Sequence, residues 1–389
     1  MQHLGMGLIG PGFVAEHHID AVRRLGYVDV VALAGSSQET ADQKARAWHI
    51  PRAYSRFEEL IQDSAVHVVH NTTPNHMHFQ VSMAALAAGK HVISDKPLAR
   101  TVEECKKLWR AAKDLRLANV VTFNYRGNPL IQQARAMIEA GDIGTPVFVR
   151  GHYLQEWLTD EHVYSWRSNP DLGGASSALA DIGSHWCDLM EHVSGLKIQS
   201  VLADMTTVVP VRYSEPNIRK EAFSKSGVGA TVAHTIVSED LASVLLRLPG
   251  GARGCFSVGQ VLPGHKNDCF FEICGRKGSI RWQQERPAEL RFDLFGEPSR
   301  MIVQEADARY QDAKRLTHLP AGHNQGWPDA FRNVMEDAYA WIQSGADPRH
   351  KPIPLATFED GYRSSRLLEA MLGSARQNGV WTTVPDSGA

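Results

Sequence analysis

The chain has 389 residues, of which 43% are hydrophobic and 22% are charged, and its formal net charge is −2. This composition is typical of a globular protein of about two domains, and the small net charge argues against binding to nucleic acid or an anionic membrane. No apolar run is long enough to span a bilayer, and the first residues lack the pattern of a signal peptide. The five cysteines contain no Cys-x-x-Cys pair. We therefore expect a cytoplasmic protein with free thiols.

A short apolar strand at residues 6–9 leads into Gly10-x-Gly12-x-x-Ala15, and a helix is predicted from there to Arg23. Gly10 permits the tight turn, Gly12 lets the backbone approach a pyrophosphate, and Ala15 lets the helix pack against the strand. The helix N-terminus offers N–H groups and a positive dipole end to phosphates. Strand, turn and helix in this order predict a dinucleotide-binding fold.

The second strand, residues 28–34, is followed by Gly35-Ser36-Ser37, where such folds usually carry a ribose-binding acid. A serine hydroxyl can bind either a ribose hydroxyl or a 2′-phosphate. No arginine adjoins Ser37 to favour the phosphate. The sequence therefore favours NAD and leaves NADP open.

Further strands at residues 66–70, 91–94 and 119–124 alternate with helices that end near residues 88 and 115. Strands and helices in such regular alternation predict an α/β fold, a doubly wound parallel sheet with right-handed crossovers. We expect this Rossmann domain to occupy residues 1–125.

Asp95-Lys96-Pro97 follows the strand at residues 91–94. Pro97 disfavours the helical region for Lys96, so the lysine should lie in an extended segment or a turn. Just past the carboxyl end of a buried strand, it would point into the crevice where such sheets bind ligands. The alternative is a surface loop with a salt bridge.

From residue 126 onward the pattern changes to long strands with few helices between them. The predicted strands lie at residues 146–157, 199–211, 231–248, 251–258, 269–274 and 279–282, and two late helices at residues 326–343 and 358–376. We expect a second domain of α+β type, residues 126–389, built on a large, mainly antiparallel sheet. A broad sheet with few covering helices also predicts oligomerisation through its exposed face.

A polar stripe follows Gly173-Gly174 on a predicted helix: Asp181, His185, Asp188 and His192. Asp181 and His185 lie one turn apart, so the carboxylate can orient the imidazole and raise its basicity. This pairing suits a general base. The stripe could also be a solvated face, or ligate a metal together with ligands from elsewhere in the chain.

Four motifs in this order resemble the glucose–fructose oxidoreductase, inositol dehydrogenase and rhizopine catabolism (Gfo/Idh/MocA) family. They are Gly10-x-Gly12-x-x-Ala15 with His18, Thr73-Pro74-Asn75-His76-x-His78, Asp95-Lys96-Pro97, and Asp181-x-x-x-His185. The family usually has Glu-Lys-Pro as its central motif, so Asp95 shortens the acid and leaves Lys96 intact. Residues 284–287 and 320–326 further resemble sugar dehydrogenases of the levoglucosan and glucoside 3-dehydrogenase kind.

The resemblance implies a Rossmann domain, a C-terminal sheet domain that forms homodimers or homotetramers, and hydride transfer between a sugar or polyol carbon and nicotinamide. It implies that Lys96, Asp181 and His185 are catalytic. An NAD-dependent glycosidase acting by transient oxidation and a non-catalytic dinucleotide-binding regulator are the alternatives. The residues expected to bind the coenzyme are Gly10, Gly12, Phe13, Val14, Ser36, Ser37, Thr73, Pro74, Asn75, His78, Asp95, Lys96 and Asn124. Those expected to bind the sugar are Lys96, Tyr153, Asp181, His185 and His323, and Gln155 lies on the same predicted strand face as Tyr153.

Overall fold

The computed structural model describes residues 3–215, 232–305, 310–345 and 355–385. The chain divides into an N-terminal unit, residues 1–127 with 327–365, and a C-terminal unit, residues 128–326 with 366–389. The first boundary lies close to the expected one at residue 125. Residues 327–365, however, belong to the N-terminal unit, which differs from the expected division. No described helix is long and apolar enough to cross a membrane.

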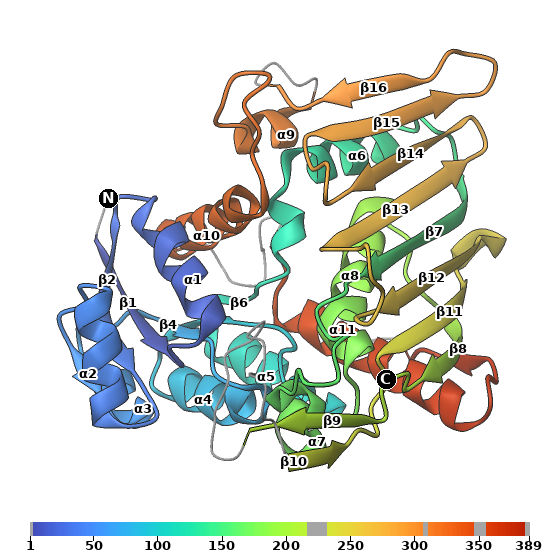
Figure 1. The fold of residues 1–389 in the computed structure, drawn as a ribbon. Helices are drawn as coiled ribbons and strands as arrows, with labels where there is room; N and C mark the ends of the chain where they lie inside the picture. Colours follow the sequence, from blue (N-terminus) through green and yellow to red (C-terminus); the bar gives the residue numbers. More distant parts are fainter. Residues whose placement is uncertain (1–2, 216–231, 306–309, 346–354, 386–389) are drawn as a thin grey trace. The chain divides into compact units, whose positions relative to one another are not determined.

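The N-terminal unit contains a six-stranded parallel sheet with the order β3-β2-β1-β4-β5-β6 (Figure 1). The strands are β1 Leu4–Ile9, β2 Val28–Ala34, β3 Ala53–Tyr54, β4 Val68–Asn71, β5 His91–Ser94 and β6 Asn119–Val121. The helices between them are α1 Phe13–Arg23, α2 Gln38–Ala47, α3 Phe57–Gln62, α4 Asn75–Ala87 and α5 Val102–Leu115, and a short 3₁₀ helix, η1 Asn124–Gly127, follows β6. This confirms the predicted doubly wound sheet. Its strand order reverses between β1 and β4, where ligands bind in such folds.

Adjacent residues of the central strands point into cores on opposite faces of this sheet. Val68 and Ile93 belong to one hydrophobic cluster, whereas Val69 and Val92 belong to the other. Strands buried on both faces read as continuous apolar runs, which is why these segments were recognisable in the sequence.

Helix α10, Trp327–Ser344, completes the cover of one face of this sheet. Phe331, Met335 and other apolar side chains of α10 belong to the same cluster as Val68. Asn333 also donates to the carbonyl oxygen of Gly127 at 2.9 Å. A parallel sheet must be covered on both faces, which explains why a helix so late in the chain joins the N-terminal unit.

The C-terminal unit contains a nine-stranded sheet with the order β16-β15-β14-β13-β7-β12-β11-β8-β17. These strands are β7 Pro146–Leu154, β8 Ser200–Thr206, β11 Leu241–Arg247, β12 Arg253–Gly259, β13 Asp268–Gly275, β14 Gly278–Gln283, β15 Glu289–Leu294, β16 Arg300–Val303 and β17 Thr382–Thr383. Only β7 and β12 pair in parallel, so the sheet is mainly antiparallel, as predicted. A separate ribbon pairs β9 Val211–Ser214 with β10 Val232–Thr235.

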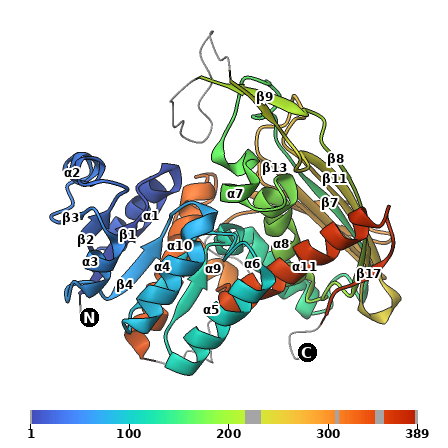
Figure 2. The same ribbon diagram turned by 90° about the horizontal axis from the view of Figure 1, so that it is seen from below.

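Helices lie on one face of the large sheet (Figure 2). They include α6 Pro129–Glu139 and α8 Ser184–Ser194, and the unit also contains α7 Pro170–Gly173, α9 Gln311–Leu316, the short helices η2 Trp166–Ser168, η3 Leu179–Gly183 and η4 Pro249–Gly251, and the second half of α11 Phe358–Arg376. Along β11, Val244 is buried while Leu245 is exposed, as expected when one face is covered. The predicted strand 231–248 is in fact two strands, β10 and β11, and β15 and β16 were not predicted.

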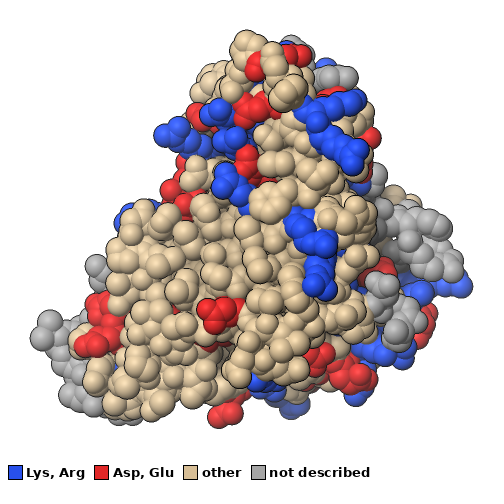
Figure 3. All heavy atoms as spheres, turned by 90° about the vertical axis from the view of Figure 1, so that its right-hand side faces the viewer, with Lys and Arg blue, Asp and Glu red and all other residues tan. Residues whose placement is uncertain are grey.

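The outer face of this sheet carries a chain of ion pairs across neighbouring strands. Arg150 and Arg281 both bind the carboxylate of Glu272, and Arg281 also lies 3.6 Å from Asp293. Figure 3 looks at the side of the molecule on which this sheet lies, where large areas carry neither acidic nor basic side chains. Three apolar side chains of this sheet are each about half exposed: Leu245 on β11, and Met301 and Val303 on β16.

A buried histidine pair makes the stability of the N-terminal unit depend on pH. Nδ1 of His18 lies 2.8 Å from Nδ1 of His70, and Nε2 of His70 lies 2.9 Å from the hydroxyl of Tyr339. Burial lowers the pKa of His18 to about 4, against a smaller opposing effect of Asp95. Burial likewise lowers the pKa of His70.

We expect acidification to destabilise this unit before its carboxylates titrate. The unfolded chain binds protons at these imidazoles below about pH 6.5, whereas the folded chain binds them only at lower pH, so stability falls as pH drops from about 6.5. By pH 5 His18 alone should cost about 2 kcal/mol, because one pKa unit corresponds to about 1.4 kcal/mol. Urea unfolding at pH 7 and pH 5 measures this loss. His18→Gln should show a shallower pH dependence, and an equal slope in both proteins would contradict the assignment.

Candidate active site

The glycine turn after β1 has the geometry that its sequence predicts. Gly10 has a φ of +97°, and a Cβ there would lie 2.7 Å from the backbone of Thr72. Gly12 begins α1 without any capping side chain, and a Cβ on it would meet no atom within 4 Å. Ala15 is fully buried against the sheet. The turn therefore leaves open space in front of the helix N-terminus, which begins at Phe13 and Val14.

The turn after β4 is held by a buried hydrogen-bond network. Thr72 donates to the carbonyl oxygen of Gly10 at 2.7 Å, and Thr73 donates to the side chain of Asn71 at 2.7 Å. His78 was expected to bind the coenzyme. It is buried, and its ring nitrogens lie 2.7 Å from the Thr73 carbonyl oxygen and 2.6 Å from that of Pro97. His78 thus joins this turn to the next one, and any effect on a ligand is indirect. Pro74 and Asn75 begin α4 and are half-buried.

Asp95 organises the turn that presents Lys96. Its Oδ1 accepts from the backbone N–H of Lys96 and from the hydroxyl of Thr122, both at 2.8 Å. Burial by itself would raise the pKa of Asp95, but the charge of Lys96, smaller contributions from His18 and His78, and the hydrogen bond from Thr122 together hold this pKa below its usual range. The Lys96–Pro97 peptide bond is cis. The turn after β5 is therefore built around an ionised carboxylate, not an open surface loop.

Ser36 and Ser37, which follow β2, differ in their contacts. Ser37 begins α2, and its hydroxyl accepts from the backbone N–H of Thr40 at 3.2 Å. Ser36 is exposed, so it is the better placed of the two to meet a ribose. Asn124 is buried in η1, and its Nδ2 has no hydrogen-bond partner in the described part of the chain. A ligand that accepts a hydrogen bond would satisfy this donor.

In the C-terminal unit, Asp181 lies in a π-helical turn, η3, that runs directly into α8. Such turns insert an extra residue into a helix and often occur at functional sites. His185 is buried one turn later, and every residue of α8 is buried, so the solvated-face interpretation is wrong. Trp186 anchors the helix: its Nε1 donates to the Phe270 carbonyl oxygen at 2.9 Å, and a Cβ on Gly151 would collide with it.

A buried carboxylate from another part of the chain caps this helix. Oε1 of Glu239 accepts from the backbone N–H groups of Ser177 and Leu179 at 3.1 and 2.9 Å, and from the Ser176 hydroxyl at 2.6 Å. The N-cap residue itself, Ala178, offers no side-chain acceptor. Burial raises the pKa of Glu239, while the hydrogen bonds from Ser176 and the backbone oppose the rise. Glu239 therefore shares the capping of this helix with Ser176, whose hydroxyl accepts from the backbone N–H of Ala180 at 3.2 Å.

Asp181 also has two partners that the sequence analysis did not identify. Nε2 of Gln260 donates to its Oδ2 at 2.8 Å, and Nε of Arg167 lies 3.7 Å from its Oδ1. Both residues are distant in sequence from Asp181. No local motif indicated them.

Tyr153 and Gln155 belong to one polar network beside His185. The Tyr153 hydroxyl and the Gln155 amide both donate to Oδ1 of Asn267, at 2.7 and 3.0 Å. The centre of the Tyr153 ring lies 6.3 Å from that of His185. Glu285 holds Asn267 in turn by accepting its backbone N–H at 2.9 Å.

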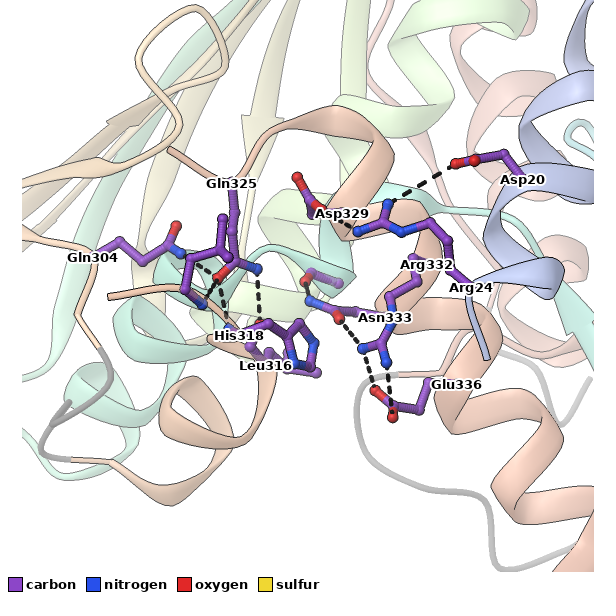
Figure 4. A network of polar contacts seen from close by, with 12 residues as sticks. Asp20, Arg24, Gln304, Leu316, His318, Gln325, Asp329, Arg332, Asn333 and Glu336 are labelled. Carbon is purple, nitrogen blue, oxygen red and sulfur yellow. Dashed lines mark hydrogen bonds and ion pairs between the residues drawn. The ribbon is translucent and has the colours of Figure 1, made fainter. Parts of the chain in front are cut away.

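His323 lies in an exposed turn, residues 317–326, that is organised by Gln325 (Figure 4). The buried Gln325 side chain accepts from His318 N at 2.7 Å and donates to the Leu316 carbonyl oxygen at 3.1 Å. Its Oε1 also accepts from the side chain of Gln304 at 2.7 Å. Within the described ranges, no cluster of three or more His, Cys, Asp or Glu side chains could hold a metal ion.

Comparison with known proteins finds a matching family model in each unit. Residues 4–123 match the model of an oxidoreductase family with an NAD-binding Rossmann fold, and residues 131–281 match the GFO/IDH/MocA C-terminal domain. A levoglucosan dehydrogenase from Pseudarthrobacter phenanthrenivorans is 30% identical over 410 aligned positions, with all of both chains covered. The chain belongs to the Gfo/Idh/MocA family. This confirms the predicted family and both predicted fold types.

Solved structures of this family agree with the assignment. A levoglucosan dehydrogenase in complex with NADH and levoglucosan has a TM-score of 0.88 and 29% identity, and 99% of this chain and all of that one are covered. An inositol dehydrogenase homolog with NAD⁺ from Azotobacter vinelandii has a TM-score of 0.85 at 25% identity, covering 98% and 97% of the two chains. The protein is thus an oxidoreductase with an NAD-binding Rossmann domain. The open space at Gly12 and the unpartnered amide of Asn124 fit such a coenzyme.

Proposed function

We propose that the protein is an NAD-dependent dehydrogenase that transfers a hydride between a secondary alcohol carbon of a sugar, sugar derivative or polyol and nicotinamide. The observation that carries this proposal is the full-length similarity to a levoglucosan dehydrogenase. A relative named inositol 2-dehydrogenase/D-chiro-inositol 3-dehydrogenase from Lactiplantibacillus plantarum, 26% identical over 60% of this chain and 69% of its own, supports a cyclic polyol or sugar as the substrate.

Lys96, Asp181 and His185 are proposed to serve one reaction. Oxidation of a secondary alcohol requires loss of the hydroxyl proton while the hydride leaves the carbon. His185 accepts this proton as general base. Lys96 donates to the same oxygen and stabilises the charge that develops there, while Asp181 orients the imidazole. The side chains of Tyr153 and Gln155 are proposed to bind sugar hydroxyls, and the exposed His323 is proposed to bind the sugar as well.

NAD is the proposed coenzyme, and when bound it supplies the hydride acceptor. Gly12 and the backbone of Phe13 and Val14 would receive its pyrophosphate. Ser36 would meet the adenosine ribose, because the hydroxyl of Ser37 already caps α2. Thr73, Pro74, Asn75, Asp95 and Asn124 remain proposed coenzyme contacts.

The direct test is a panel of cyclic sugars, anhydrosugars and polyols with NAD and with NADP, read by absorbance of the reduced coenzyme. Steady accumulation of NADH with at least one of them is expected. Release of an aglycone from a glycoside without net NADH would instead indicate a glycosidase that oxidises transiently. Binding of NAD without either reaction would indicate a regulator.

A reducing compartment, the cytoplasm, is proposed from the cysteines. Each is a free thiol in the structure. Burial raises the pKa of Cys105 to about 12 and also raises that of Cys269. Such thiols are unreactive, which suits structural rather than redox use.

Self-association through the outer face of the nine-stranded sheet is also proposed, as a homodimer or homotetramer. Leu245 is 48% exposed on β11, an interior strand of that sheet. Arg150 and Arg281, on neighbouring strands of this face, are paired with Glu272. A sheet face with exposed apolar side chains such as Leu245 is a suitable interface between copies of one chain.

Lys96→Ala should reduce kcat by orders of magnitude and leave NAD affinity nearly unchanged. The lysine supplies a positioned charge to the reacting oxygen, and a single group of this kind is typically worth about 3 kcal/mol. Steady-state kinetics and calorimetric NAD titration measure the two effects. Lys107→Ala, an exposed lysine on α5 of the same unit, is the matched control and should behave as the parent. Near-normal turnover of Lys96→Ala would remove the lysine from the mechanism.

His185→Ala should abolish the rise of kcat with pH. A general-base imidazole must be deprotonated to accept the hydroxyl proton, so oxidation should increase with pH through its pKa, ordinarily about 6.5. Asp181→Asn removes the charge that supports the imidazolium and should move the inflection to lower pH, with a large loss of turnover. Rate profiles between pH 5 and 9 test both variants. If His185→Ala keeps the inflection of the parent, another base operates, and Lys96 is the first candidate.

Leu245→Asp should shift the protein toward monomers, because it places a charge at the centre of the proposed interface. Light scattering coupled to gel filtration gives the mass. Leu115→Asp, an equally exposed leucine on α5, is the control and should leave the mass unchanged. An oligomer that survives Leu245→Asp intact assembles through another surface.

A further inference from the structure

Asp181 is contacted on one side by a buried glutamine that lies 79 residues further along the chain. Nε2 of Gln260 is 2.8 Å from Oδ2 of Asp181, and only 1% of the glutamine is exposed. Arg167 approaches the other carboxylate oxygen, at 3.7 Å. The two oxygens of Asp181 are therefore distinguished by their neighbours.

The orientation of the Gln260 amide follows from the chemistry of the groups around it. An ionised carboxylate only accepts hydrogen bonds, so the end of the amide that faces Asp181 is the NH₂ group. At the other end, Oε1 lies 3.5 Å from the hydroxyl of Ser177, which can donate to it. Both contacts require the same orientation.

The backbone of Gln260 is anchored on both sides. Its N–H donates to the carbonyl oxygen of Asp240 at 3.0 Å, and its carbonyl oxygen accepts from the N–H of Leu158 at 2.9 Å. The residue directly follows β12, at the end of a strand in the large sheet. The amide is thus a fixed point against which the carboxylate is placed.

We propose that Gln260 is a positioning residue that sets the rotamer of Asp181 by holding Oδ2, which fixes where Oδ1 lies. This rests on the proposed function, in which Asp181 acts in alcohol oxidation. A neutral amide suits the task because it orients the carboxylate without neutralising its charge. Loss of a supporting group of this kind typically lowers activity by a factor of about 10 to 100.

Two variants of nearly the same size separate positioning from packing. Gln260→Met fills the same space without a donor, and we expect it to lower kcat tenfold or more at every pH, with NAD affinity unchanged. Gln260→Glu places a second carboxyl group against Asp181. Relative to the parent at the same pH, we expect a similar loss of kcat at pH 8 and a smaller loss at pH 5, because two adjacent carboxyl groups then share one proton and the hydrogen bond returns.

The matched control is Gln283→Glu. Nε2 of Gln283 donates to Oδ1 of Asp268 at 2.8 Å in the same unit, so this variant also places a glutamate against an aspartate, here one that contacts His152 and His265. It should keep the parent's kcat and pH profile. A pH-dependent recovery in the control as well would attribute the effect to general stability and overturn the proposal.

A second measurement does not need the substrate. Carbon-13 spectra of protein labelled at the aspartate carboxyl carbon give the titration of Asp181, assigned by loss of its signal in Asp181→Asn. In Gln260→Glu the midpoint should move to higher pH, and in Gln283→Glu it should not move. An unchanged midpoint overturns the role of Gln260 even if the enzyme is active. If no sugar is oxidised but the midpoint moves, the proposed function fails while the contact stands.

Discussion

Buried carboxylates that accept backbone N–H groups give the candidate turns their shape. Asp95 accepts the N–H of Lys96 after β5, and Glu239 accepts the N–H groups of Ser177 and Leu179 before α8. Irregular backbone leaves donors without partners, and a buried donor must find one. Charge-assisted hydrogen bonds supply it more strongly than neutral ones. The chemistry-bearing residues therefore depend on these two acids as much as on the sheets beneath them.

Much of the N-terminal unit could be predicted because its signals are local. Gly10 and Gly12 follow a buried strand directly, and Lys96 is followed by the proline that restricts it. Each feature is read within about ten residues of chain. The local sequence around Ser37 could not show that it would cap α2, because a hydroxyl at a helix start can serve either capping or ribose binding.

What could not be predicted came from contacts between distant residues. Glu239, which precedes β11, and Gln260, which follows β12, act on the Asp181 turn from distant parts of the chain, and no motif surrounds them. The π-helical turn at Leu179–Gly183 is likewise invisible to a pattern that assumes regular helical spacing. Helix α10 is amphipathic in sequence, but only packing reveals that it covers the Rossmann sheet. The sequence thus carried no signal for the residues that hold the Asp181 turn in place, because they are joined to it only in the folded chain.

The contacts of the C-terminal unit are made either by backbone N–H groups or by side chains. The two kinds differ in how freely the residues that make them could be substituted. Glu239 holds the start of the helix that carries His185 through backbone N–H groups, which any residue at positions 177 and 179 other than proline would supply. Tyr153 and Gln155 are tied through side chains, since both donate to the single oxygen of Asn267. Replacement of Asn267 would remove one hydrogen bond from each of them at once. A chain built this way can keep the helix that carries His185 fixed while the side chains proposed to meet the sugar vary.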